Sequence, residues 1–489
     1  MNRACFSEST NLHQYIDMRA QSDQLKSNYL RIKKTFSVFL ISLLVLSVSA
    51  QEKPAATPEK KVKTGWKFGG ALPAVTYDSD LGFQYGALAE FFNYGDGSKF
   101  PGFFDHTYTE ISRYTKGSGI YRFMYESNHL IKGVESVSDL SYLPDKANSF
   151  FGFNGYESVY NKDWINDKLP SYPDGPYKTR MFYAMERNQF RFKNDFQGKL
   201  LGDHIKWSAG FAFQDFTINQ VDIQRLNKGS KNPLPTNDAE PGLFERYHVL
   251  GLISDNEANG GWVNTLKAGL TWDSRDNRPN PMKGVWSEMG IEVAPKFMGN
   301  DWGFSRFYIT HRQYFTLIDK NLSLVYRLGF QTKLSGDVPF FYQSQVITSR
   351  LTGANSEGLG GSKTLRGVQR NRVVGDGFFM GNVELRWKPL YFKFLKQDCY
   401  LGLNGFYDFG RVTKNIDMPS DLSTRFSTLY PSEVYSDYFR PGTEKFHMSA
   451  GTSIMLAMNQ NFIIAIDIGK ALNEQDGNIG FSIGLNYLF

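Results

Sequence analysis

Cysteine and histidine are scarce in this chain of 489 residues, and their scarcity excludes several kinds of site. The only cysteines are Cys5 and Cys399. They lie far apart, and Cys5 belongs to an N-terminal segment that we expect to be removed. No disulfide is therefore expected within the mature chain, and a cysteine metal site is excluded. None of the seven histidines stands in a recognisable Ser/His/Asp or metal-ligand arrangement. The sequence predicts no enzyme activity, no catalytic residue, no metal site and no cofactor.

Blocks of one charge are also missing. The 55 Lys and Arg residues outnumber the 49 Asp and Glu residues by only six, and the cations are spread along the chain. A nucleic-acid footprint needs a dense basic patch, so nucleic acid is not an expected partner. Aromatic residues, in contrast, make up 16% of the chain, and glycine is frequent with 46 residues. This combination favours β-sheet over helix.

Long apolar runs are absent except for one, residues 36–48, which follows Lys33 and Lys34 and precedes Ala50. A basic start, an apolar core and a small-residue exit are typical of a secretory signal peptide. We predict that residues 1–50 are this signal peptide, with Met18 as an alternative start. A membrane anchor is the alternative interpretation, but the run is shorter than the ~20 residues that spanning requires. Residues 51–65 form a short periplasmic linker, too small to fold alone.

Strict alternation of apolar and polar residues marks the remainder, residues 66–489. The clearest segments are residues 206–214, 266–273, 285–294, 322–331, 380–389 and 462–469. Each has one face rich in charge and glycine and one apolar face, and the apolar faces end in Trp, Tyr or Phe. A soluble β-sandwich alternates as well. The segment length, close to the ~9–11 residues of a tilted membrane strand, and the recurrence without any helical stretch favour an all-β transmembrane antiparallel barrel in one domain.

The end of the sequence also predicts a barrel. In residues 479–489 the apolar side chains share one face, which is formed by Phe481, Ile483, Leu485, Tyr487 and Phe489. We expect this segment to be the last strand and to close against the first, residues 67–78, so that no strand edge is left in lipid. The ending resembles the C-terminal sorting strand of bacterial outer-membrane barrels. Together with the signal peptide it predicts a multi-pass barrel in the Gram-negative outer membrane, in contact with outer-membrane lipid.

A glycine-rich segment in the last third carries the most informative motif. Leu365-Arg366-Gly367 precedes Gly375, Gly377 and the alternating stretch 382–386. Together with residues 81–86 (LGFQYG), 271–277 (TWDSRDN) and 406–410 (FYDFG), it resembles the BamA/TamA outer-membrane assembly superfamily, also called the bacterial surface antigen family. The resemblance covers residues 66–489. It departs from the family pattern at Val368, where an aromatic residue is usual.

The resemblance implies one barrel of about 16 strands with an arginine loop folded into its lumen. It implies that Arg366, beside Gly367 at the loop tip, pairs with an acid on the inner wall. Strand parity puts Asp408 and Glu384 on the inward face, and the planar fork of an arginine can bind a carboxylate with two hydrogen bonds. The alternative is that these charges only solvate a water-filled lumen. In either case their role is structural.

The resemblance further implies a thin seam between the first and last strands that opens to admit a polypeptide edge. Glycines loosen strands, so Gly69, Gly70, Gly480 and Gly484, with Phe489 at the end, are the candidate seam residues. An ordinary role of these glycines in turns is the alternative. Family members usually carry periplasmic modules (POTRA) ahead of the barrel, and none is evident in this sequence. We therefore expect a protein partner that supplies them.

Two functions remain open at this point. The resemblance implies assistance in outer-membrane protein assembly or export, with an unfolded β-barrel or an exported polypeptide as the client. The alternative is a passive channel for small solutes. A lumen lined by charges fits that alternative equally well, and the charges in question are Glu288, Glu292, Arg327, Arg386 and Lys388.

Overall fold

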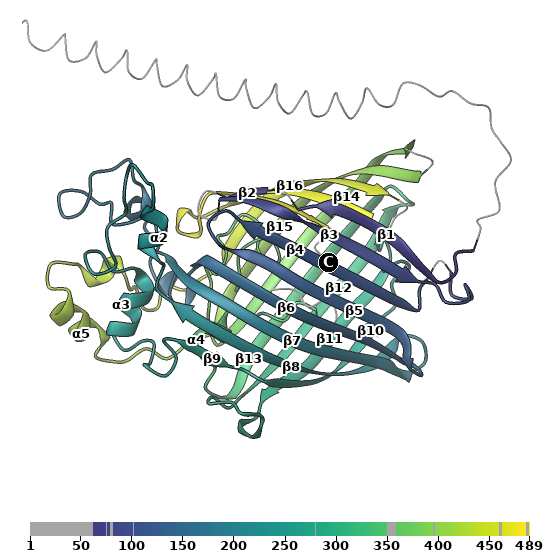
Figure 1. Cartoon of the computed structure of the whole chain (residues 1–489), viewed down its shortest axis with the longest axis horizontal. Coiled ribbons are helices and arrows are strands. Elements are labelled where there is room, and N and C mark those ends of the chain that lie inside the picture. Colours follow the sequence, from purple (N-terminus) through teal and green to yellow (C-terminus); the bar gives the residue numbers. More distant parts are fainter. Residues whose placement is uncertain are drawn as a thin grey trace, which may run out of the picture. The chain divides into compact units, whose positions relative to one another are not determined.

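The alternating segments become long strands, and successive strands pair antiparallel in chain order (Figure 1). The computed structural model describes residues 62–489 apart from residues 75, 79–81, 101, 279, 350–357, 395–396, 459–461 and 486–488. The predicted signal peptide, residues 1–50, and residues 51–61 of the linker lie outside the described residues.

Eighteen strands make up the sheet in the described part of the chain. They are β1 (Trp66–Pro73), β2 (Thr76–Asp78), β3 (Gly82–Asn93), β4 (Asp105–Tyr114), β5 (Gly119–Ile131), β6 (Val134–Ser149), β7 (Ala184–Leu201), β8 (Ile205–Asn219), β9 (Gly260–Trp262), β10 (Thr265–Asp273), β11 (Gly284–Ala294), β12 (Phe304–Ile318), β13 (Leu322–Gly336), β14 (Gly377–Phe394), β15 (Gln397–Lys414), β16 (His447–Met458), β17 (Phe462–Ala471) and β18 (Ile479–Leu485).

These strands amount to sixteen staves, where a stave is one strand or one interrupted strand of the barrel wall. β1 and β2 both pair with β3, and β9 and β10 both pair with β8, so each of these pairs forms a single interrupted stave. Figure 1 shows the sheet curling round, with β3 to β8 in front of β11 to β15. The prediction of an all-β fold with about sixteen antiparallel strands is confirmed.

The two faces of the sheet follow the predicted parity. On β14, Asn382, Glu384 and Arg386 are buried on the inner face, whereas Leu385 and Trp387 are about half exposed on the outer face. The alternation arises because successive side chains of a strand point to opposite sides. The outer face thus offers an apolar band suited to lipid, and the inner face gathers the polar and charged groups.

Short helices occur in the long connections, so the expectation that no helical stretch interrupts the strands is wrong there. They are α2 (Ile223–Asn227), α3 (Leu243–Val249), α4 (Phe340–Gln343) and α5 (Leu422–Leu429), with 3₁₀ turns at Gly155–Glu157, Lys162–Ile165, Lys296–Met298, Tyr435–Asp437 and Glu474–Asp476. Helices of four to eight residues are too short to leave a recognisable period in a sequence. In the described part of the chain, none is long and apolar enough to cross a bilayer.

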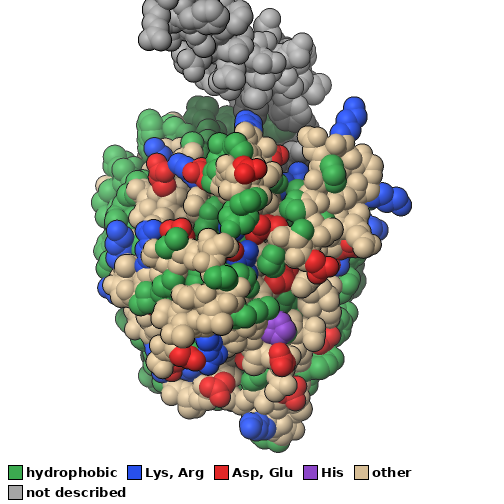
Figure 2. All heavy atoms as spheres, turned by 90° about the vertical axis from the view of Figure 1, so that its left-hand side faces the viewer, with side chains coloured by type: hydrophobic (Ala, Val, Ile, Leu, Met, Phe, Trp, Pro, Cys, Tyr) green, Lys and Arg blue, Asp and Glu red, His purple; other side chains and the backbone are tan. Residues whose placement is uncertain are grey.

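Three long connections at one end of the barrel pack together, and we call them the cap: residues 150–183, 220–259 and 415–446. They lie at the left in Figure 1. An aromatic core unites them, in which Phe150, Tyr247 and Phe426 are almost fully buried. Tyr438 and Phe439 are buried in this core as well. Figure 2 looks onto this end and shows apolar, acidic and basic side chains interspersed over a filled surface.

The first and last strands differ from the prediction. The first, expected as residues 67–78, is interrupted after Pro73 and resumes as β2. The last, expected as residues 479–489, is described as Ile479–Leu485, and residues 486–488 of that prediction lie outside the described residues. Phe489 was expected to share the outward face of Phe481, and this is wrong: Phe489 is 7% exposed, whereas Phe481 is 63% exposed. Parity holds only within a strand, and Phe489 itself is not in a strand.

Candidate functional site

The connection between β13 and β14 folds into the lumen, and we call its residues 337–376 the arginine loop. Leu365, Val368 and Val373 pack into a buried cluster with Phe378 and Val412, whose side chains point inward from β14 and β15. Val368, which stands where the family usually has an aromatic residue, therefore serves as an apolar contact between the loop and the wall.

A hydroxyl–backbone turn shapes the tip of the arginine loop. The Thr364 hydroxyl accepts a hydrogen bond from the backbone N–H of Gly360 (2.8 Å) and donates to the Gly360 carbonyl (2.7 Å). Gly360 and Gly367 have positive φ angles, which glycine adopts at little cost. The turn directs Arg366 toward β14 and β15.

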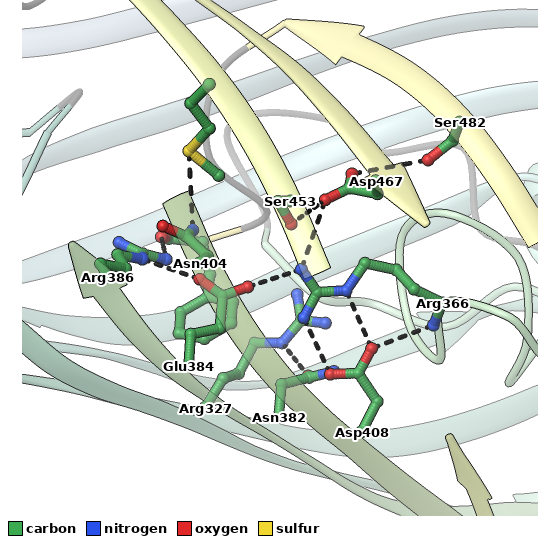
Figure 3. Close-up of polar contacts among 12 residues, drawn as sticks. Arg327, Arg366, Asn382, Glu384, Arg386, Asn404, Asp408, Ser453, Asp467 and Ser482 are labelled. Atoms are coloured by element: carbon green, nitrogen blue, oxygen red, sulfur yellow. Dashed lines mark hydrogen bonds and ion pairs between the residues drawn. The ribbon is translucent and has the colours of Figure 1, made fainter. Parts of the chain in front are cut away.

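Arg366 holds two carboxylates of the inner wall (Figure 3). Its Nε and Nη2 donate to the two carboxylate oxygens of Asp408, each over 2.9 Å, and its backbone N–H donates to Asp408 Oδ2 over 3.0 Å. Its Nη1 lies 2.7 Å from Glu384 Oε1. All three side chains are at most 2% exposed. The structure thus brings together the residues named as the loop anchor, in the bidentate geometry that favours an arginine.

Two partners of Arg366 were missed by the sequence reasoning. The guanidinium carbon lies 3.6 Å from the centre of the Phe406 ring, which comes from the inner face of β15. The Asp467 carboxylate of β17 lies 3.6 Å from Arg366 Nη1. Parity placed Phe406 inward, and an aromatic face attracts a cation at this distance. Parity could not show that Asp467, three staves from β14, faces the same guanidinium.

Arginines of the wall hold the backbone of the loop. Arg306 Nη1 donates to the Gln345 carbonyl (3.0 Å), and Arg327 Nη2 donates to the Lys363 carbonyl (3.0 Å). Arg312 donates to the Thr348 carbonyl. The loop is therefore fixed along its length by hydrogen bonds from charged donors, which are stronger than neutral ones.

Each wall arginine has a polar partner on the wall itself. Arg306 pairs with Glu292, and Arg312 Nη1 lies 3.1 Å from Glu288 Oε2. Arg327 Nε donates to Asn382 Oδ1 over 2.8 Å. In a separate pair, Arg386 Nε lies 2.7 Å from Glu384 Oε2, so Glu384 bridges Arg386 and Arg366. A buried charge is costly unless it is paired, and this network pairs these guanidiniums with carboxylates or amides.

The outer end of the loop is joined to the cap through Arg372. Its guanidinium donates to the backbone carbonyls of Gly155 (2.9 Å), Ser158 (3.1 Å) and Gln475 (2.6 Å). Nearby, His447 Nδ1 lies 2.6 Å from Asp476 Oδ1, a contact buried from solvent. The loop is thus held both by the barrel wall and by the external connections.

Phe489 occupies a second place in the lumen. Its ring centre lies 5.0 Å from the guanidinium carbon of Arg386 and 5.1 Å from that of Arg327. Arg386 Nη2 donates to the Phe489 carbonyl over 2.8 Å, and Tyr314 and Val325 complete a buried apolar cluster. Two cations facing one ring explain why this aromatic side chain turns inward.

The four candidate seam glycines all lie within strands and not in turns. Gly69 sits at a register shift between β1 and β3, and a Cβ there would clash with the Phe92 ring. Gly70 has open space around it. Gly480 faces the loop tip, and Gly484 pairs with Ala465 of β17.

A cavity of about 850 Å³ opens beside the loop tip. Its lining includes Arg366, Gly367, Asp467, Gly480 and Ser482, so the loop and the last two strands form its walls. In the part of the chain that the structure describes, no group of three or more His, Cys, Asp or Glu side chains is arranged to hold a metal ion. The arrangement can hold a loop and position strands.

Comparisons with known proteins agree with this geometry. Residues 155–487 match the family model described as the Omp85 superfamily domain. Among solved structures, CdiB from Escherichia coli is similar, with 10% identity, a TM-score of 0.50 and coverage of 88% of this chain and 62% of that chain. At this identity the similarity concerns the fold alone. A comparison with curated proteins gives no match.

Two other solved structures align with lower TM-scores. BamA from Haemophilus ducreyi lacking POTRA domains 1–3 has 12% identity and a TM-score of 0.47, with coverage of 87% of this chain and 71% of that chain. CdiB from Acinetobacter baumannii has 11% identity and a TM-score of 0.41, with coverage of 87% and 60%. The chain therefore spans less than two thirds of either CdiB chain.

Proposed function

This chain belongs to the Omp85 superfamily, and on that premise we propose that it inserts or translocates polypeptides at the outer membrane of a Gram-negative cell. The observation that carries the proposal is the arginine loop, locked inside the barrel by Arg366, Asp408 and Glu384. A barrel that only conducts solutes gains nothing from a buried loop that fills its lumen. A machine that handles polypeptides needs a shaped interior beside a strand edge.

The last strand supplies the edge on which a client polypeptide would pair. The outward side chains of β18 are unusually open, with Ile479 65%, Phe481 63% and Ile483 60% exposed, against 46% for Ile468 on the adjacent β17. Backbone groups of an edge strand pair readily with another extended segment. We propose that an unfolded β-barrel or an exported polypeptide is the client.

The passive channel is the second candidate, and the structure disfavours it on one side of the lumen and favours it on the other. Glu288, Glu292, Arg327 and Arg386, which would line a channel, are at most 4% exposed and engaged with the loop or with other residues of the lumen. In contrast, the side chains of Glu90 and Arg122, on the inner face of β3 and β5, are 30% and 23% exposed. Any solute path would run along the inner face of β3 to β5.

Two further points belong to the proposal. We propose that the chain acts with a protein partner that supplies periplasmic modules of the POTRA type, as the resemblance of its sequence to the family implies. We also propose that the chain has no enzyme activity of its own, since the buried carboxylates described above are paired with arginines.

Depletion of the protein followed by quantitative proteomics of the outer membrane tests the function. Broad loss of other barrels supports assembly, and loss of a single exported product supports dedicated translocation. Re-expression of the wild-type chain must restore the profile, and re-expression of Arg366→Ala must restore it less completely. An unchanged outer-membrane proteome after depletion contradicts the proposal and favours the channel.

A further inference from the structure

The tip of the arginine loop rests directly on the last two strands, and we infer that this contact sets the position of β18. The contact itself does not depend on the proposed function. Its consequence for a client polypeptide does rest on the proposed function, because β18 is the edge that a client would use. Two independent features carry it: a row of glycines across the wall, and a carboxylate that joins Arg366 to β18.

The glycine row crosses three neighbouring strands. Gly451 of β16 pairs with Gly469 of β17, and Gly469 pairs with Gly480 of β18. The missing side chains of Gly469 and Gly480 leave a shallow groove on the inner wall in which the loop tip lies, whereas the space at Gly451 is filled by the Phe406 ring. A Cβ on Gly469 would lie 2.5 Å from the Arg366 carbonyl oxygen, and one on Gly480 would lie 3.0 Å from Gly367 Cα. No side chain fits between the tip and these strands.

The tip itself is glycine for the same reason. Gly367 has a φ of 96°, a conformation that other residues rarely adopt, and a Cβ there would lie 2.6 Å from the Gly469 carbonyl carbon. Glycine therefore faces glycine at the contact. Close backbone packing of this kind fixes position more tightly than side chains that can change rotamer.

Asp467 is the second link between the loop and the last strand. Its carboxylate lies 3.6 Å from Arg366 Nη1 and accepts hydrogen bonds from the Ser482 hydroxyl of β18 (3.5 Å) and from the Ser453 hydroxyl of β16 (Figure 3). One carboxylate thus connects the loop cation to strands β16, β17 and β18. Asp467 is therefore a positioning residue for β18, on which it acts through its hydrogen bond with Ser482.

Because of these contacts, the position of the last strand depends on the ion pairs that hold the loop. As long as Arg366 is bound by Asp408 and Glu384, Gly367 occupies the groove at Gly480, and β18 is braced from inside. If the tip withdraws, β18 loses its inner support on the side of the 850 Å³ cavity. The loop therefore controls the edge that the proposed function uses.

Distance measurements between spin labels in the purified, membrane-reconstituted barrel test the inference. In a Cys399→Ser background, labels at Ile483→Cys on β18 and Leu328→Cys on β13 report the position of the last strand. Gly480→Val, which forces a side chain against the loop tip, must shift or broaden the distance distribution by about one strand residue, ~3.3 Å. Asp467→Asn keeps the volume of the side chain but removes its charge. It must shift or broaden the distance distribution as well, to a smaller extent.

Matched controls separate this effect from general loosening. Gly405→Val introduces the same side chain on β15, where a Cβ meets nothing within 4 Å. Glu474→Gln removes another carboxylate from the cavity lining, one that pairs with Lys162 and not with Arg366. Both must retain the wild-type distance. The mobility of each variant on unheated gels shows whether the barrel is folded. The inference is overturned if folded Gly480→Val and Asp467→Asn protein also retains the wild-type distance.

The outcome is distinguishable from failure of the proposed function. If β18 moves in the two variants while outer-membrane protein assembly and export are unimpaired, the link between loop and strand stands and the proposed function fails. If β18 stays in place while assembly or export is impaired, the link fails and the function stands.

Discussion

Arg366 is the residue on which most of the interior depends. Its guanidinium is removed from water, which is costly for a charge, and three carboxylates and an aromatic ring surround it. Asp408 accepts from it through two side-chain bonds and one backbone bond, so this carboxylate would be buried without a cation if the arginine were removed. The stabilising effect therefore lies in the pairing and not in the charge itself.

Substitution of Arg366 tests this interpretation. Arg366→Ala should leave the barrel inserted but lower its stability by about 3–5 kcal/mol, the usual effect of breaking a buried ion pair. Arg366→Lys should have an intermediate effect, because lysine keeps the charge but loses the planar fork. The measurements are the temperature of the mobility shift on unheated gels and protease cleavage within residues 358–376.

Arg411→Ala is the matched control for this substitution. Arg411 also lies on a wall strand, but its Nε donates to the Val412 carbonyl and its guanidinium carbon lies 5.6 Å from the centre of the exposed Phe446 ring, with no carboxylate partner among the described residues. This variant should keep the wild-type heat stability. A wild-type melting temperature for Arg366→Ala would show that the anchor does not stabilise the barrel.

At the residue scale, the sequence predicts the direction of a side chain but not its partners. Parity placed Asp408 and Glu384 inward, and the family motif suggested that Arg366 meets them. The contacts of Asp467 and Phe406 depend on the register between staves and on the path of the loop, neither of which alternation reveals. Phe489 was assigned to the wrong face because its surroundings, two guanidiniums, come from strands distant in sequence.

At the scale of elements, the cap is held by a cluster of four charged side chains from three connections, each at most 10% exposed: Lys178, Glu240, Arg246 and Glu433. Arg246 lies 2.9 Å from Glu240 and 2.7 Å from Glu433, and Lys178 lies 3.1 Å from Glu433. Aromatic rings cover it, with the Arg246 guanidinium carbon 4.6 Å from the centre of the Tyr430 ring. The cluster joins connections that are otherwise held by apolar packing.

This cap cluster predicts a response to acid. Burial is the largest single influence and would raise the pKa of the Glu433 carboxyl, but Arg246, the Tyr438 hydroxyl and Lys178 together outweigh it and lower that pKa below its ordinary value of 4.5. The folded pKa is therefore lower than the unfolded one, so the stabilisation is present above about pH 4.5 and is lost as the pH falls through the lowered value. We expect the cap to become sensitive to an acid-tolerant protease within residues 415–446 as the pH falls below this value.

Glu433→Gln should be open to cleavage already at pH 7 and should respond much less to acid, since the titrating group is gone. Glu474→Gln, which removes a carboxylate paired only at the exposed surface, serves as the control and should follow the wild type. If wild type and Glu433→Gln show the same dependence on pH, the cluster does not hold the cap.

Helices and strands could be predicted from the sequence only where they are long enough to give a regular pattern of apolar and polar residues. The long alternating segments were identified because two-residue periodicity over eight or more residues has no other common cause. The short helices were missed, and the interruption of the first strand was missed although Pro73, which has no N–H to donate, stands at the break. The connections fold through aromatic packing between distant segments, which leaves no periodic signal.

At the scale of the whole molecule, the fold class followed from composition and alternation, but the state of the lumen did not. The same inward charges suit a wet channel or a loop-filled interior, and only the structure shows that the later staves are engaged with the arginine loop while the early staves keep partly exposed groups. The molecule is therefore asymmetric across its lumen. One half holds the loop against β14, β15 and β17, and the other half keeps partly exposed charged groups such as Glu90 and Arg122.

Conductance in a planar bilayer tests this asymmetry. Wild-type protein should give small, unstable currents, because the loop fills the later half of the lumen and the cap covers its outer end. Arg366→Ala should give larger and more frequent openings, since the loop then loses its main anchor, whereas Arg411→Ala should resemble the wild type. Large, steady currents from the wild type would mean that the path along β3 to β5 is already open, and the solute channel would then replace polypeptide handling as the better account of the barrel.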